Sequence, residues 1–136
     1  MKVKKKWKVL LLAIILIAVS YALTYIPHKI VKISPSKVSS IKILDGNTGK
    51  STVITERKDI EHIINNLNSI TFKKDKCSLF YMGYSFRTTI YRNDGSVYKK
   101  FIINSENTLR KYPFFYSDTT RSIDYDYIKN LIDKQN

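Results

Sequence analysis

The chain has 136 residues, of which 24 are lysine or arginine and 11 are aspartate or glutamate, so its formal net charge at pH 7 is +13. Residues 1–32 hold seven lysines and no acid, which leaves a net charge of +6 on residues 33–136. About a hundred residues beyond that N-terminal region suffice for one small domain and exclude a second one within this chain. The single cysteine, Cys77, excludes an intramolecular disulfide and suits an exported bacterial domain held by its core alone.

Residues 9–26 are eighteen uncharged residues, eleven of them valine, leucine or isoleucine. As a helix rising 1.5 Å per residue, such a run is about 27 Å long, close to the ~30 Å hydrocarbon core of a bilayer. Trp7 at one end and Tyr21 and Tyr25 toward the other are amphipathic rings suited to the headgroup level. The sequence therefore predicts a transmembrane helix over residues 9–26.

The two flanks of this run differ in charge. Five lysines lie within residues 1–8, against His28, Lys29 and Lys32 on the other side. Because the more basic flank stays in the cytoplasm, residues 1–8 are predicted to be a cytoplasmic tail and the C-terminal part to be extracytoplasmic. Small residues at signal-peptidase spacing near residues 18–22 leave open the alternative of cleavage and secretion.

The extracytoplasmic part begins with residues 27–38, in which a proline stands between two serines, and these are predicted to be a stalk. Residues 39–136 are predicted to be the domain. It opens with Ser39–Leu44 and Lys50–Thr55, two runs rich in isoleucine, valine and threonine. Residues 45–49 join them with glycine and asparagine, which tolerate the positive φ of a tight connection, so a β-hairpin is predicted.

Two helices are predicted from apolar stripes. Thr55 is predicted to be the N-cap of the first, with Glu56 and Asp59 in its acidic first turn. The first stripe has the spacing i, i+3, i+4 and i+7, and consists of Ile60, Ile63, Ile64 and Leu67. The second lies within Asp124–Lys134 and consists of Tyr127, Ile128, Leu131 and Ile132.

Between the helices, alternating patterns predict four strands: Ile70–Lys73, Tyr84–Arg92, Val97–Ile103 and Thr108–Tyr112. A basic loop is predicted around Lys73, Lys74 and Lys76, and an aromatic loop over residues 113–116. The order ββα, about four strands, then α predicts an α+β fold. In this fold an N-terminal transmembrane helix precedes one small antiparallel-sheet domain with its helices on one face.

The residues needed for catalysis or metal binding are sparse. The only histidines are His28, beside the apolar run, and His62, on a helix flank; neither is near a candidate nucleophile in the sequence. No set of histidine, cysteine or acidic residues has the spacing of a metal site. The sequence therefore predicts a protein that is not an enzyme and has no cofactor or metal.

Aromatic and basic residues supply the candidate binding surface, because tyrosine and arginine are over-represented at binding hot spots. A basic extracytoplasmic domain also attracts anionic lipids and acidic wall polymers. Nucleic acid is not an expected partner, since the predicted topology places the domain on the other side of the membrane from it. The candidate residues are Lys73, Lys74, Lys76, Arg87, Tyr91, Phe114, Phe115 and Tyr116.

Three segments together resemble a family: residues 40–49 (SIKILDGNTG), residues 59–68 (DIEHIINNLN) and residues 84–95 (YSFRTTIYRNDG). They are similar to an uncharacterised family of small membrane-anchored or lipid-anchored extracytoplasmic proteins of Gram-positive bacteria. The resemblance covers residues ~33–134 and implies no functional residue. No lipidation cysteine follows the apolar run, and this favours a membrane helix as the tether of this chain.

Taken together, the sequence predicts a single-pass membrane protein. Its extracytoplasmic domain is predicted to bind a protein or an envelope component without catalysis. A hydrolase or an immunity-type inhibitor with a dispersed site is the alternative from another class, and the oligomeric state is left open.

Overall fold

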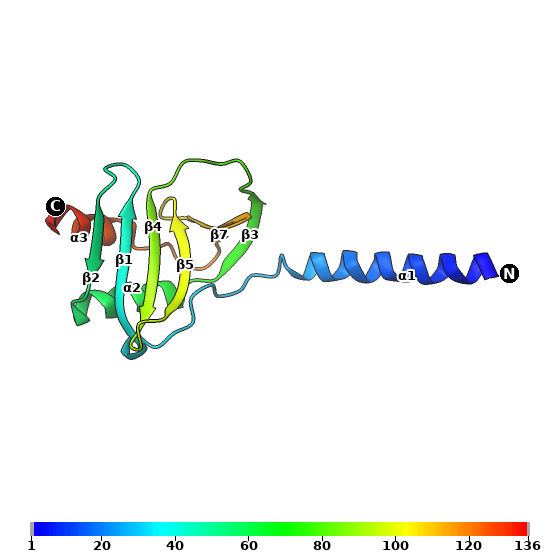
Figure 1. Cartoon of the computed structure of the whole chain (residues 1–136), viewed down its shortest axis with the longest axis horizontal. Coiled ribbons are helices and arrows are strands. Elements are labelled where there is room, and N and C mark those ends of the chain that lie inside the picture. Colours follow the sequence, from blue (N-terminus) through cyan, green and yellow to red (C-terminus); the bar gives the residue numbers. More distant parts are fainter. Residues whose placement is uncertain (1, 136) are drawn as a thin grey trace.

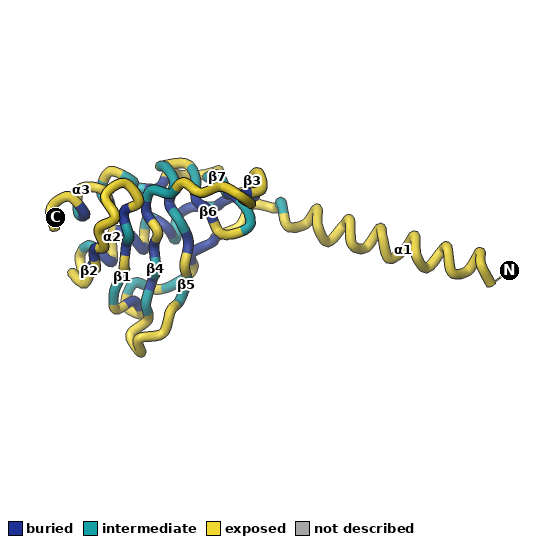
Figure 2. The backbone as a smooth tube through the Cα atoms, turned by 45° about the horizontal axis from the view of Figure 1, so that its top comes forward, coloured by how far each residue is buried: buried dark blue, intermediate teal, exposed yellow. Residues whose placement is uncertain are grey.

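The computed structural model describes residues 2–135 and consists of a long N-terminal helix that projects from one α+β domain (Figure 1). Its elements are α1 (Lys2–Leu23), the 3-10 helix η1 (Pro35–Lys37), β1 (Val38–Asp45), β2 (Ser51–Ile54), α2 (Arg57–Ser69), β3 (Phe72–Cys77), β4 (Phe86–Arg92), β5 (Val97–Ile103), β6 (Thr108–Lys111), β7 (Phe114–Asp118) and α3 (Tyr125–Gln135). Helix α1 is long and apolar enough to cross a membrane, and it is exposed along its whole length (Figure 2).

The seven strands form one sheet in the order β2-β1-β4-β5-β6-β7-β3, and every neighbouring pair is antiparallel. The predicted α+β class and the antiparallel sheet are confirmed. Five strands separate α2 from α3, one more than predicted. The additional strand is β7, because residues 114–118 pair with both β6 and β3. The aromatic loop predicted over residues 113–116 is therefore wrong.

Helices α2 and α3 cover one face of the sheet, as predicted (Figure 1). The stripe of α2 is fully buried there, and α3 contributes Ile128 and Ile132 to the same core. The predicted N-cap Thr55 is wrong: Glu56 occupies the N-cap position and its side chain makes no capping hydrogen bond. The first turn closes on the carbonyl of Glu56, which accepts from the amides of Asp59 and Ile60.

The predicted stalk, residues 27–38, is packed into the domain. His28 forms an antiparallel bridge with Phe72 at the start of β3. Ile30 and Val31 are buried in the core. These two side chains are apolar enough to favour burial, so the segment acts as a part of the domain and not as a spacer.

Side chains of the domain bind the backbone of this segment from several sides. Asn68 accepts from the amide of Ile33 at 3.2 Å and donates to its carbonyl at 2.7 Å. The Tyr98 hydroxyl likewise accepts from the amide of Lys32 and donates to the carbonyl of Lys32. Further bonds to backbone carbonyls of the segment come from Arg57, Asn93 and Lys99. Only four residues, 24–27, therefore separate α1 from the folded domain.

Candidate functional site

The candidate residues from the sequence fall into two parts of the sheet. Arg87 and Tyr91 lie on β4, in the middle. The others lie on the adjacent strands β3 and β7, the part of the domain nearest α1 (Figure 1). The candidates on β3 are Lys73, Lys74 and Lys76, and those on β7 are Phe114, Phe115 and Tyr116.

The basic loop predicted for the three lysines is wrong, because all three lie in β3. Strand β3 pairs with β7, and this pairing places Lys74 opposite Tyr116 and Lys73 opposite Ser117. β3 is an edge strand, where lysine side chains are common because their charge discourages pairing with another chain. Adjacent lysines on a strand point to opposite faces, so Lys73 is exposed whereas Lys74 is buried.

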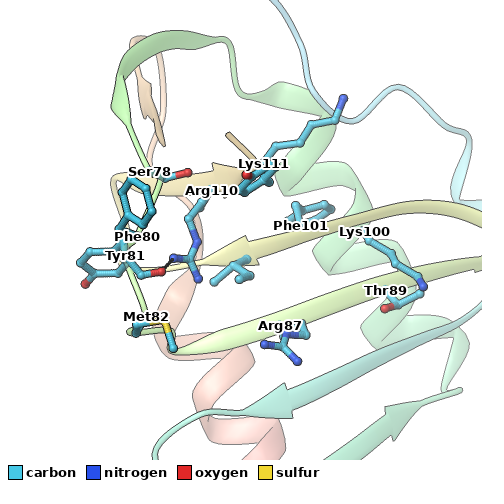
Figure 3. Close-up of a pocket in the computed structure, with 12 residues that line it drawn as sticks. Ser78, Phe80, Tyr81, Met82, Arg87, Thr89, Lys100, Phe101, Arg110 and Lys111 are labelled. Atoms are coloured by element: carbon cyan, nitrogen blue, oxygen red, sulfur yellow. Dashed lines mark hydrogen bonds between the residues drawn. The ribbon is translucent and has the colours of Figure 1, made fainter. Parts of the chain in front are cut away.

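A pocket lies on the other face of the sheet, the one that the helices leave open (Figure 3). It has a volume of about 520 Å³ and is bounded by β4, β5, β6 and the loop of residues 78–85. We call it the open-face pocket. Its floor follows the register of the strands, in which Arg87 lies opposite Ile102 and Ile102 opposite Arg110.

Four cations and no acid line this pocket: Arg87, Lys100, Arg110 and Lys111. The Arg110 side chain is only 8% exposed, and its Nη1 donates to the Tyr81 carbonyl at 2.8 Å. Burial lowers the pKa of the Arg110 guanidinium; the phenol of Tyr81 raises it and the charge of Arg87 lowers it further. Among residues 2–135, no carboxylate lies within 4 Å of any of the four cations. The pocket therefore has a positive potential that no ion pair within residues 2–135 neutralises.

The loop that forms one wall of the pocket exposes apolar side chains to solvent. Phe80 is 96% exposed and Met82 is 88% exposed. Phe80 also has a φ of +66°, a left-handed conformation that costs about 1–3 kcal/mol in a bulky residue. A strained backbone that presents an aromatic ring to water is typical of binding sites, where the surrounding structure maintains the strain.

The loop is fixed at both of its ends and in its middle, and at its start the Ser78 amide donates to the Pro113 carbonyl at 2.8 Å. Tyr81 packs edge-on against Phe115 with ring centroids 5.1 Å apart, which buries Phe115 on the open face and outside the main core. At the other end, the Gly46 amide donates to the Ser85 carbonyl at 2.7 Å. A Cβ on Gly46 would lie 2.1 Å from the Tyr84 carbonyl oxygen, so only glycine fits there.

Ser78 provides an unused hydrogen-bonding group inside the pocket. Its side chain is 3% exposed, lines the pocket and points toward Arg110 (Figure 3). Its Oγ has no hydrogen-bond partner among the described residues. Buried hydroxyl groups are normally paired, so this one is an unsatisfied polar group in the wall of the pocket.

The sequence named only one lining residue of this pocket, Arg87, as a candidate binding residue. It missed Arg110, Lys100 and Lys111, which are separated along the chain and meet only through strand pairing. The available signal was in β5 and β6, where Lys100 stands next to the buried Phe101 and Arg110 stands next to the buried Leu109. The predicted Tyr91 is half-buried near the far end of β4 and does not line the pocket.

One further polar cluster links the two helices. The Nε2 of His62 lies 2.6 Å from the Oδ2 of Asp124, and its ring stacks on Tyr127 with centroids 3.7 Å apart. The Tyr127 hydroxyl donates to Asp59 at 2.7 Å. Within residues 2–135, His62 has no serine, threonine or cysteine as a hydrogen-bond partner, and no group of three potential metal ligands occurs. This geometry ties α2 to α3.

No protein-family model matches the chain, and neither the comparison with curated proteins nor the comparison with solved structures finds a similar protein, so the family resemblance noted from the sequence stays a prediction.

Proposed function

We propose that the chain is a single-pass membrane protein with a cytoplasmic N-terminus. Its extracytoplasmic domain binds an acidic segment of a partner protein in the open-face pocket, without catalysis. The apolar helix α1 and the five lysines ahead of its apolar run support the topology. The observation that carries the binding role is the pocket itself, in which four uncompensated cations lie beside an exposed, strained apolar loop.

The composition of the pocket favours a protein over a wall polymer. Aromatic residues, methionine and arginine are the residue types enriched in the centres of protein interfaces. Phe80 and Met82 would gain from contact with apolar side chains, which a polyanionic polymer does not have. Arg87 and Arg110 are suited to carboxylates because a guanidinium can bind a carboxylate through two parallel hydrogen bonds.

Peptide binding tests the proposal on the full chain, held in nanodiscs of zwitterionic phosphatidylcholine. The probes are fluorescein-labelled peptides that combine acidic residues with leucine and phenylalanine, and matched peptides with glutamine in place of the acids. Fluorescence anisotropy is followed as salt rises and the Debye length falls from ~10 Å at 0.1 M to ~3 Å at 1 M. We expect binding of the acidic peptides only, weakening several-fold with salt.

Variants separate the contributions. Arg87→Ser with Lys100→Ser should flatten the salt dependence, and Phe80→Ser with Met82→Ser should weaken binding at every salt concentration. The matched control is Lys58→Ser with Lys129→Ser, which removes two charges from the exposed sides of the helices. Binding that survives both pocket variants contradicts the proposal. Preferential competition by poly(glycerol phosphate) would instead identify an anionic polymer as the ligand.

The native cysteine tests the topology. Cys77 is the only cysteine and is exposed, so a membrane-impermeant maleimide should label the chain on intact cells. Labelling only after lysis would reverse the orientation. Recovery of a shortened chain from the medium would show instead that α1 is a cleaved signal sequence.

A further inference from the structure

Lys74 is a buried cation at the junction between α1 and the domain. Its side chain is 8% exposed, and its Nζ donates to the Oγ1 of Thr24, just beyond the end of α1, at 2.7 Å. The ammonium lies 4.1 Å from the ring centroid of Phe114 and 5.2 Å from those of Tyr21 and Tyr25. Aromatic faces attract a cation but do not neutralise it.

The ammonium of Lys74 has no carboxylate counter-ion among residues 2–135. It has three N–H donors, and only the one directed at Thr24 has an acceptor among the described residues. No carboxylate of residues 2–135 lies within 4 Å of it. Because a buried charge is costly unless it is paired, this position favours an anion supplied from outside.

Two hollows beside Lys74 have room for such an anion. One, of about 430 Å³, is lined by Lys73, Lys74 and Lys76 together with Tyr25, Asp75 and Ser117. Its single carboxylate, on Asp75, accepts a hydrogen bond from Ser117 at 3.2 Å, and three cations remain against one acid. The other, of about 480 Å³, is lined by Leu23, Thr24, Ile26, His28, Lys74 and Tyr116.

The neighbouring helix end does not account for the lysine. A cation near a helix C-terminus is favourable because the last carbonyls carry partial negative charge. Here the carbonyls of Tyr21, Ala22 and Leu23 already accept from the backbone amides of residues 24–26. The two remaining donors of Lys74 are thus not needed to satisfy the helix.

We propose that Lys74, with Lys73 and Lys76 beside it, binds the phosphate of an anionic phospholipid headgroup of the outer leaflet. This inference rests on the proposed anchoring. The apolar run ends at Ile26, which places Lys74 at the level of the headgroups. The four-residue connection holds the domain against that surface, so a bound headgroup would fix the orientation of the open-face pocket relative to the membrane.

The test uses the full chain in liposomes that contain phosphatidylcholine and a phosphatidylglycerol analogue with a photoreactive headgroup. After illumination, cross-linked peptides are mapped by mass spectrometry. We expect cross-links at two places: at Lys2–Lys8, where lysines meet the inner headgroups, and at Lys73–Cys77. Lys74→Met, which keeps the length of the side chain, should lower the second set several-fold and leave the first unchanged. Lys74→Arg should retain both sets.

Each outcome decides between distinct statements. Cross-links at Lys2–Lys8 with none at Lys73–Cys77, or equal cross-linking of wild type and Lys74→Met, overturns the lipid site and leaves the anchoring intact. A chain that does not float with the liposomes and cross-links nowhere overturns the anchoring. Loss of the Lys73–Cys77 set on adding excess inorganic phosphate would assign the site to free phosphate and so overturn the lipid proposal.

Discussion

The two faces of the sheet are built from the same strands and differ at every second residue. In β5, Ile103 is fully buried under the helices, whereas Ile102 faces the open-face pocket. In β6, Leu109 lies in the core and Arg110 lines the pocket. The covered face is almost entirely apolar, and the open face carries cations and aromatic rings.

This difference separates the structural task from the binding task within each strand. The covered face fixes the register, because a slip of one residue in β5 would move Phe101 to the open face and Lys100 into the core. Once the register is fixed, Arg87 and Arg110 are aligned across three strands without contributing to the core. The open face is thus free to carry uncompensated charge.

The largest effect is expected at the centre of the covered face. Ile64, in the stripe of α2, is fully buried. Ile64→Asp should prevent folding of the domain, because a carboxylate there would be buried without a partner, and Ile64→Ala should cost about 2–5 kcal/mol. Near-UV circular dichroism of the full chain in detergent reports the packing. An Asp variant that melts within a few degrees of wild type would show that the stripe is not in the core.

The adjacent isoleucines of β5 compare the two faces directly. Ile103→Ala should destabilise the domain by about 2–5 kcal/mol, since it leaves a cavity in the core. Ile102→Ala should cost less, roughly within 1 kcal/mol, because Ile102 is only half-buried and water can occupy the space. Urea unfolding measures both. Equal losses would mean that the open face is as much a part of the core as the covered one.

A smaller effect is expected where the β1–β2 turn supports the loop of the open face. Gly46→Ala would bring a Cβ to 2.1 Å from the Tyr84 carbonyl oxygen, so the loop must shift. We expect a loss of about 1–3 kcal/mol together with weaker peptide binding. Gly49→Ala is the control, since a Cβ there meets nothing within 4 Å and strain arises only from its φ of +72°. Its peptide binding should equal that of wild type.

The covered face was predictable from the sequence because burial leaves a periodic signal. The spacing of Ile60, Ile63, Ile64 and Leu67 located α2, and the run from residue 97 to residue 103 was predicted with the bounds of β5. These patterns depend only on which residues favour burial. The sequence of each segment shows this without reference to any other segment. The α+β class followed from their order.

The open face and the linker were not predictable, because their structure depends on contacts distant in sequence. The pocket brings Arg87 next to Arg110 only through β5, and Phe115 is covered by a loop more than thirty residues earlier. Residues 27–38 contain too few apolar residues for a periodic signal, yet their backbone is held by Asn68 and Tyr98. Lys74 and Lys76, beyond the end of the predicted strand Ile70–Lys73, lacked a strand signal because β3 is an edge strand whose exposed positions favour charge.

The smallest effect is expected on the outer side of the helix layer, where Tyr127 donates its hydroxyl to Asp59. This hydrogen bond, followed by burial and the charges of Asp59 and Asp124, raises the pKa of Tyr127 from 10.0 to about 12. Only the protonated phenol can donate. The stabilisation is therefore complete below pH 10, and it is lost as the pH rises through about 12.

The comparison of wild type with Tyr127→Phe isolates this contribution. Urea unfolding of both chains should show wild type the more stable at pH 8, and the difference should shrink as the pH rises between 10 and 12. Because all other tyrosines and lysines titrate in both chains, their contributions cancel in the difference. Asp59→Asn should reduce the pH dependence, since the amide oxygen accepts the bond without a charge to repel the phenolate. A difference that stays constant across this range would show that the bond to Asp59 does not hold α2 and α3 together.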